Sequence, residues 1–305
     1  MENTGITLFK ERLPETPSIV EWLGCVLNAE DNVGIDGWVN SYQETSNLQK
    51  ELEKKQIHLT LAPDPFNELW TDRPALPDNK VFIHELKYAG LSCKDKITQI
   101  REAIRRNSCT GILISALDEV AWINLRGSDV HCNPVFVSYL LITEYSSTLY
   151  IIENKLSDEV KDYLTENEIK VRPYSTIEKD LKDFTGKLLL SANINAAVHA
   201  AACAHSLIEI APSPVLFLKA IKNETEIEGF HRAMKRDGVA MVKFLRWLKA
   251  AVSTGNETEI SIDKKLYEFR AGQPHFNGIS LTPLPDIKLM ALLFTMKQPP
   301  KPIFP

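Results

Sequence analysis

Residues 111–143 read GILISALDEVAWINLRGSDVHCNPVFVSYLLIT, and this stretch decides the fold class. The short apolar run GILIS predicts a buried strand. Asp118–Ile123 predicts a short helix, and Pro134–Thr143 predicts a long strand because it is rich in aromatic and β-branched residues. Thr148–Glu153 follows after a four-residue turn and predicts the hairpin partner of that strand. Strands that alternate with helices in this way indicate an α/β fold with a mixed sheet.

The flanking segments extend this stretch into a complete domain. Ser92 can cap a helix that runs to about Asn107, since Ile97, Ile100 and Ile104 fall on one stripe of it. Downstream, the pattern predicts helices at 157–167 and 176–184, a strand near Val171, another at 187–190, and an alanine-rich helix to His205. The sequence therefore predicts a mixed α/β domain over residues 78–215.

Residues 1–62 form a separate α/β piece with no strand before its first helix. The pattern predicts helices at 17–27 and 41–55 and strands at 32–37 and 57–61, as expected for the C-terminal part of a first domain. Residues 63–77 contain four prolines, which lack the amide hydrogen and restrict the residue before them. We expect a proline-rich linker there.

Residues 216–280 predict two helices. The first is capped by Asn223 or Thr225, runs to about Val252, and carries an apolar stripe. The stripe consists of Ile227, Phe230, Met234, Met241, Leu245 and Leu248. The second helix spans 257–271. Two helices without a sheet cannot close a core, so we expect the start of a truncated domain, an exposed stripe and self-association.

Composition excludes several classes of protein. The 305 residues include 35 Lys and Arg against 40 Asp and Glu, a net charge of −5 that gives no reason to expect nucleic acid or an anionic membrane surface. The apolar run 289–294 is far shorter than the ~20 residues of a spanning helix. No secretory leader opens the chain. We expect a cytoplasmic protein without a membrane segment.

The spacing of the cysteine and histidine residues indicates neither a metal site nor a redox site. The five cysteines are scattered, with no CxxC pair, and therefore predict free thiols. There is no HExxH motif, and His199 and His205 lie six residues apart, on different faces of the predicted helix. Nucleophile-elbow and phosphate-loop motifs are also absent. The sequence predicts no catalytic residue, metal ligand or cofactor in this chain.

One cluster of polar residues invites a functional interpretation. Arg126 and Asp129 flank a glycine turn between a tryptophan-bearing helix and a buried strand. Polar groups packed there must be hydrogen-bonded, because a buried polar group without a hydrogen-bond partner destabilises the fold by roughly 1–3 kcal/mol. Two interpretations are open. The residues form an Arg126–Asp129 brace that pins the turn, or one of them faces the cleft of a neighbouring domain.

The same residues carry a family resemblance. ALDEVAWINLRGSDV (116–130) followed by NPVFVSYLLI (133–142) resembles the middle domain of the three-domain Xaa-Pro aminopeptidases, in the creatinase and pita-bread metallopeptidase family. LWTDRP (69–74) and YAGLSCKDKI (88–97) resemble that family's linker and the start of its middle domain. Segments 219–248 and 258–270 resemble the first two helices of its catalytic domain. The resemblance implies creatinase N-terminal-like (ribonuclease H-like) domains at 1–62 and 78–215.

The resemblance also implies a chemistry. Family members remove an N-terminal residue when proline stands second, using two divalent metals, usually manganese. The ligands lie in motifs resembling DSGAQY, GTTDxTRT, GHGVG, EPGYY and RIEN, and none of these occurs in this chain. We therefore expect a fragment that lacks the metal centre and is inactive alone.

Residues 281–305 differ from the family pattern. If one base is restored after the Ser280 codon, the reading frame of this segment shifts. With permitted codon choices the shifted frame then encodes a family-like continuation, in which residues 291–296 become GAIVHY. We therefore interpret 281–305 as a frameshifted tail. An alternative for the whole chain is a non-catalytic creatinase-like module that binds a protein partner. The coding DNA beyond Pro305 discriminates, since intact ligand motifs in the shifted frame would favour the aminopeptidase.

Overall fold

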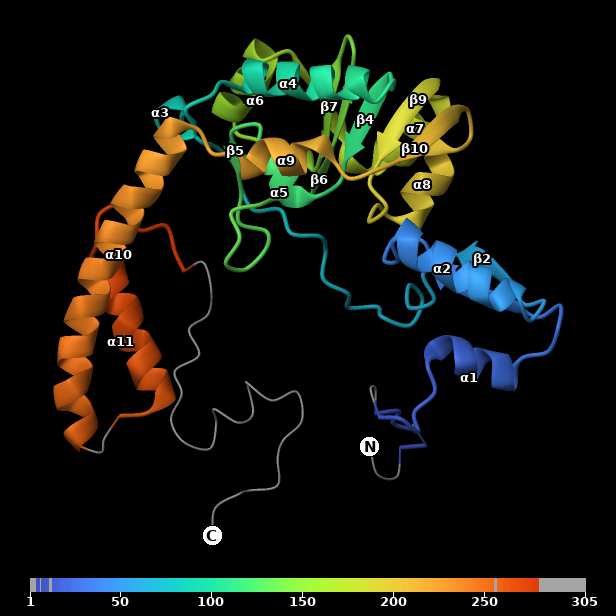
Figure 1. Ribbon diagram of the computed structural model, residues 1–305, viewed down its shortest axis with the longest axis horizontal. Helices are drawn as coiled ribbons and strands as arrows, with labels where there is room; N and C mark the ends of the chain where they lie inside the picture. The colour runs from blue at the N-terminus through green and yellow to red at the C-terminus, as the bar shows by residue number, and fades with distance from the viewer. Residues whose placement is uncertain (1–3, 6, 11–12, 255–256, 280–305) are drawn as a thin grey trace.

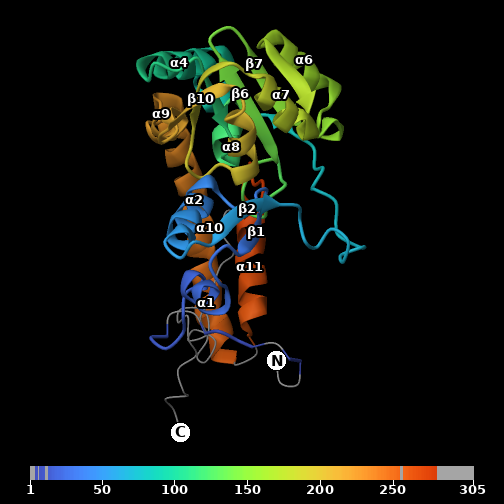
Figure 2. The same ribbon diagram turned by 90° about the vertical axis from the view of Figure 1, so that its right-hand side faces the viewer.

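A computed structural model describes residues 4–5, 7–10, 13–254 and 257–279 of the chain. Its largest element is a six-stranded sheet with strand order β10-β9-β4-β6-β7-β8 (Figures 1 and 2). The strands are β4 (Gly111–Ile114), β6 (Ser138–Thr143), β7 (Ser147–Ile151), β8 (Ile169–Pro173), β9 (Gly186–Leu190) and β10 (Ser206–Ile210). β10, β9 and β4 are parallel, β6 is antiparallel to β4 and β7, and β8 is parallel to β7. The predicted mixed α/β fold is confirmed.

Helices cover both faces of this sheet. In β4, Ile112 and Ile114 join one buried cluster whereas Leu113 joins the other, because successive side chains of a strand point to opposite faces. The first cluster packs against α4 (Cys93–Arg106), α5 (Leu117–Ala121), α6 (Asp158–Glu166) and α9 (Pro214–Ala220). The second packs against α7 (Ile177–Asp183) and α8 (Ala196–Ala202). The core is therefore divided by the sheet into two layers.

Two boundaries differ from the sequence prediction. The strand expected from Pro134 begins only at Ser138, because the Val137 amide donates to the Asp129 carboxylate (2.7 Å) instead of to a neighbouring strand. The alanine-rich helix expected to reach His205 ends at Ala202, and the chain then adds β10 to the sheet edge. The hairpin of β6 and β7 forms as predicted.

The N-terminal piece contains α1 (Ile19–Val26), β1 (Asn32–Asp36), α2 (Tyr42–Glu53) and β2 (His58–Ala62), with β1 and β2 paired in parallel. It docks on α8: the Ala197 amide donates to the Gly37 carbonyl (2.9 Å), and the Tyr42 ring stacks on His199 at 3.8 Å. A Cβ on Gly37 would lie 2.8 Å from the Ala197 nitrogen, so this approach requires glycine. Between β2 and β3 (Phe82–Ile83) the chain forms turns but no helix or strand.

The helices α10 (Glu224–Ala251) and α11 (Glu259–Ala271) lie side by side and project from the sheet domain (Figures 1 and 2). Asn223 caps α10, accepting from the Glu226 amide (3.0 Å), and also donates to the Ala89 carbonyl at the end of α3 (Leu86–Ala89; 2.8 Å). Gly90, at φ +67°, makes room for this contact, because a Cβ there would lie 2.3 Å from Asn223 Oδ1. The cap thus fixes α10 to the middle domain.

The two helices do close a small core, contrary to the expectation above. Phe244, Ile262 and Leu266 are buried between them, with Met241 and Leu248 packed against the cluster. The rest of the predicted stripe stays exposed: Ile227, Phe230, Met234 and Leu245. The tail at 281–305 lies outside the described residues. No helix among the described residues is long and apolar enough to cross a membrane.

Candidate functional site

The turn that follows β4 and α5 is built around Asn124. This residue has φ +68°, a left-handed conformation that asparagine tolerates better than most residues. Its carbonyl accepts from the His84 amide (2.8 Å), and its side chain donates to the Leu91 carbonyl (2.8 Å). The next two residues form β5 (Leu125–Arg126), which pairs antiparallel with β3 so that Arg126 lies opposite Phe82. The ladder thereby fixes the position of Arg126.

Arg126 and Asp129 do not form the expected brace. Arg126 Nη1 donates to the carbonyls of Ala121 (2.6 Å) and Leu125 (2.7 Å), and no carboxylate of the described residues lies within ion-pair distance of it. Asp129 instead pairs with Lys155, and both side chains are 0 % exposed. The Asp129 carboxylate is sealed beneath the turn, which leaves Arg126 as the one of the two residues that lines a cleft.

A second buried cation lies behind Arg126. Lys96 is 2 % exposed, and its Nζ donates to the Trp122 carbonyl (2.9 Å) and to Asn124 Oδ1 (2.8 Å). The same ammonium lies 4.7 Å from the centroid of the Trp122 ring. The pKa of Lys96 is lowered to about 8, chiefly by burial; Glu226 opposes this change and the positive charge of Arg126 adds to it. Lys96 and Arg126 together place positive charge in a poorly hydrated region.

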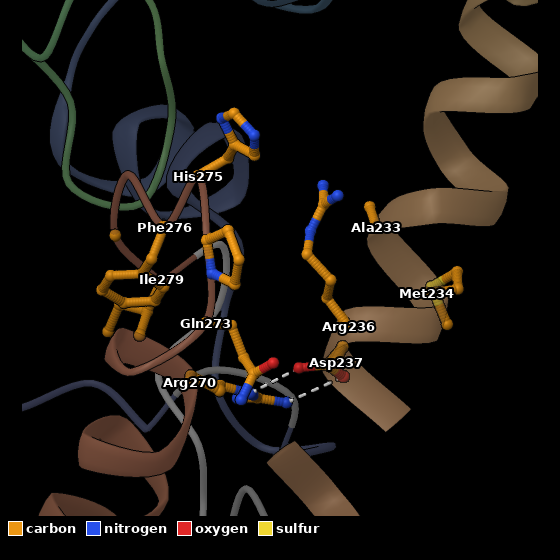
Figure 3. A pocket seen from close by; sticks show the side chains of 11 residues that line it. Ala233, Met234, Arg236, Asp237, Arg270, Gln273, His275, Phe276 and Ile279 are labelled. Carbon is orange, nitrogen blue, oxygen red and sulfur yellow. Dashed lines mark hydrogen bonds and ion pairs between the residues drawn. The ribbon is translucent and has the colours of Figure 1, made fainter. Parts of the chain in front are cut away.

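Arg126 lines a cleft between the middle domain and α10. The cleft has a volume of about 790 Å³ and receives side chains from β3, α3, α5, β5 and the first turns of α10. They include His84, Tyr88, Trp122, Arg126, Glu226 and Arg236. A smaller cavity of about 310 Å³ adjoins it between α10 and the segment after α11, and shares Arg236 and His275 with the cleft (Figure 3). There Arg270 pairs with Asp237 at 2.8 Å, which ties α11 to α10.

The charge of the cleft acts on His84. This half-buried imidazole has its pKa lowered to about 4, first by burial and then by the positive charges of Arg126 and Lys96, whereas Glu85 acts in the opposite direction. His84 is therefore neutral at pH 7. It can accept a hydrogen bond or donate one, but it brings no charge of its own.

We expect this coupling to be measurable. In an NMR titration His84 should change protonation near pH 4, and Arg126→Gln should move that midpoint upward, because the variant removes a nearby positive charge. Arg106→Gln is the control, since Arg106 is an exposed arginine of α4 paired with Glu102. An Arg126→Gln midpoint equal to that of the control would show that the charge of Arg126 does not act on the pKa of His84.

The family resemblance implies a pair of divalent metals, and the described residues do not fit one. Among them no group of three or more His, Cys, Asp or Glu side chains is arranged to hold a metal ion. The cleft does contain three carboxylates and two histidines, but among the described residues they are not grouped so that they could hold the ion. No catalytic step through a metal is derived for these residues.

Comparison with known families decides the classification. The profile of the creatinase/prolidase N-terminal domain family matches residues 72–226. The chain belongs to this family. The match runs from the linker to the first turn of α10, so it includes Arg126, His84 and Lys96.

The relatives of this creatinase/prolidase chain are aminopeptidases. Xaa-Pro aminopeptidase 1 of Dictyostelium discoideum is 34 % identical, over 92 % of this chain and 47 % of the relative. A probable Xaa-Pro aminopeptidase P of Pyricularia oryzae is 32 % identical, over 95 % and 50 %. The X-prolyl aminopeptidase of Caenorhabditis elegans, a cytosolic enzyme with a di-nuclear active site, superposes with a TM-score of 0.82 at 25 % identity, over 90 % and 46 %. The chain spans about half the length of the curated relatives it matches.

Sequence reasoning missed most of this creatinase/prolidase cleft. It singled out Arg126, but it gave no role to Lys96 of α4, to His84 just after β3 or to Glu226 of α10. One signal was present: Lys96 stands among the isoleucines of the apolar stripe of α4, and a lysine in that position needs a buried partner.

Proposed function

We propose that this chain forms the N-terminal region of an Xaa-Pro aminopeptidase, which cleaves the first peptide bond when proline stands second. The observation that carries the proposal is the extent of the structural match: one solved X-prolyl aminopeptidase aligns along 90 % of the chain with a TM-score of 0.82. Identities of 32–34 % to Xaa-Pro aminopeptidases over almost the whole chain support it. The cytosolic solved relative likewise supports a cytoplasmic location.

We further propose that this chain alone does not hydrolyse such peptides, because the sequence carries none of the family's five ligand motifs. The two metals, manganese in most family members, would then be held by sequence other than the described residues. The domain limits predicted above (1–62, 63–77, 78–215 and 216–280) belong to the same proposal. The six-stranded sheet lies within 78–215, whereas α9 (Pro214–Ala220), which packs against the same core, crosses the limit between 215 and 216.

A metal and activity assay tests this. The purified chain, dialysed after incubation with Mn²⁺, should retain no stoichiometric manganese by elemental analysis. It should release no N-terminal residue from a peptide such as Arg-Pro-Pro. The control is the same sample with EDTA. Hydrolysis that EDTA abolishes, together with one or two bound metal equivalents, would contradict the proposed inactivity while strengthening the proposed aminopeptidase function.

A further inference from the structure

We propose that the cleft between the middle domain and α10 binds the carboxylate of a peptide, with the Arg126 guanidinium as its partner. The choice of a peptide rests on the function proposed above. The carboxylate chemistry rests on the cleft itself. Four observations carry it: unpaired charge, a fixed guanidinium, a second buried cation and aromatic walls.

The cleft is positively charged on a chain that is negatively charged as a whole. Five Lys and Arg side chains line it, against three acidic ones. Several of these charges cancel locally: Lys219 pairs with Asp118, Arg232 with Glu228, and Glu85 with Lys87. Among the described residues this leaves Arg126, Lys222 and Arg236 without a carboxylate partner, facing one acid, Glu226. A negatively charged ligand would neutralise the positive charge that remains unpaired in the cleft.

Arg126 is the best-placed of these cations. Its Nη1 is held by the carbonyls of Ala121 and Leu125, and its backbone is held in the β3–β5 ladder. The hydrogen bonds among the described residues use only this one nitrogen, which leaves the other side of the guanidinium fork for a ligand. A planar guanidinium binds a carboxylate through two parallel bonds, and a side chain already fixed loses little entropy on binding.

Lys96 lines a neighbouring pocket that shares Trp122, Lys222 and Glu226 with the cleft, and it strengthens the case. Its buried ammonium is satisfied by neutral acceptors and by the Trp122 ring, not by a carboxylate. Two neighbouring cations without an acidic partner repel each other in a region of low dielectric. A carboxylate bound at Arg126 would relieve that repulsion. Glu226 attracts both cations, but it is engaged in capping α10 through the Asn223 amide (3.0 Å).

The walls of the cleft select a peptide over an inorganic anion. Phe82, Tyr88 and Phe230 line it and are 40–57 % exposed. Aromatic faces beside a cation suit an apolar residue, or a proline ring, that precedes a carboxylate. Phosphate or another small anion would leave these faces bare. We therefore assign the cleft to the terminal carboxylate of a short apolar peptide.

Isothermal titration calorimetry at low salt tests the assignment. The probes are Ala-Pro-Phe with a free carboxylate, the same peptide as the C-terminal amide, Ala-Pro-Glu amide and inorganic phosphate. The free acid should bind at least about tenfold more tightly than its amide, since a charge-assisted bidentate pair is lost in the amide. Ala-Pro-Glu amide carries its carboxylate on the side chain and not at the C-terminus. Its affinity therefore shows whether the cleft requires a terminal carboxylate. Equal binding of acid and amide, absence of saturable binding, or preference for phosphate would overturn the assignment.

Three variants locate the binding site. Arg126→Gln should reduce binding of the free acid about tenfold and remove the difference between acid and amide. Arg236→Gln should also weaken binding, and it disturbs no hydrogen bond or ion pair of the described residues, so its loss of affinity cannot be attributed to misfolding. Arg106→Gln on α4 should bind as the unaltered chain does. Unchanged binding in both cleft variants would refute the assignment.

The same samples keep this test separate from the proposed function. Release of the N-terminal residue of the peptide is measured after each titration, so that binding and hydrolysis are scored independently. Absence of saturable binding by the unaltered chain, without any hydrolysis, would refute the cleft assignment and leave the proposed aminopeptidase relationship intact. Binding that depends on Arg126, together with metal-dependent hydrolysis, would support the cleft while contradicting the proposed inactivity.

Discussion

Replacing Asp129 with Ala should destabilise the chain by about 3–5 kcal/mol, because it strands a buried charge. The side chains of Asp129 and Lys155 are each 0 % exposed, so the ammonium that remains has no contact with bulk water. The Asp129 carboxylate also accepts from the Val137 amide at 2.7 Å, at the point where the chain enters β6. The variant therefore removes the ion pair and the contact that sets the start of a central strand. Urea unfolding measures the loss.

Two further variants make this prediction specific. Glu178→Ala removes the partner of Lys182 in an exposed pair on α7, and should cost less than about 0.5 kcal/mol. The double change Asp129→Leu with Lys155→Met should cost less than Asp129→Ala alone, since it removes both charges together. If Asp129→Ala costs no more than Glu178→Ala, the buried pair does not stabilise the fold as argued here.

The sequence predicted the elements whose signals are local. The cap at Ser92, the stripe of Ile97, Ile100 and Ile104, and the β6–β7 hairpin were all identified because each depends on residues close together in the chain. The family resemblance, carried by residues 116–142, added the fold class. Predicting these features requires no knowledge of the tertiary contacts.

Features that depend on distant pairing could not be predicted in the same way. β3 is two residues long and exists because it pairs with β5 some 40 residues later. Asp129 lies only three residues from Arg126, so a local brace was the natural expectation. Its true partner, Lys155, is 26 residues away and reaches it from the 3-10 helix 153–155. The cleft likewise gathers side chains from β3 to α10, across more than half of the chain.

The exposed face of α10 leads to the last prediction. The stripe expected to be bare is only partly so, since α11 packs against Met241 and Leu248. Apart from Phe230, which lines the cleft, Ile227, Met234, Val242 and Leu245 remain 46–68 % exposed on the described surface. Contiguous apolar side chains of this kind mark an interaction surface. We propose that two copies of the chain cover it by packing α10 against α10.

The energy available suits a weak dimer. Fully burying one such side chain is worth about 1.5–3 kcal/mol, so four half-exposed side chains from each copy contribute on the order of 10 kcal/mol. Association costs an estimated 4–15 kcal/mol, so at the low end of that range a surplus of about 6 kcal/mol remains. We expect sedimentation to show a monomer–dimer equilibrium in the range of about tens of micromolar.

Val242→Lys with Leu245→Lys should shift this equilibrium to monomer, raising the dimer dissociation constant by at least about tenfold, because two charges on each copy would be desolvated and would repel. Neither residue lines the cleft, so peptide binding should survive and report an intact fold. The control is Lys94→Gln with Lys161→Gln, which alters two exposed charges on α4 and α6. An unaltered chain that stays monomeric at high concentration would show that α10 does not pair with a second copy. A monomeric chain whose lysine variant only loses stability would show in addition that the face is covered within one chain.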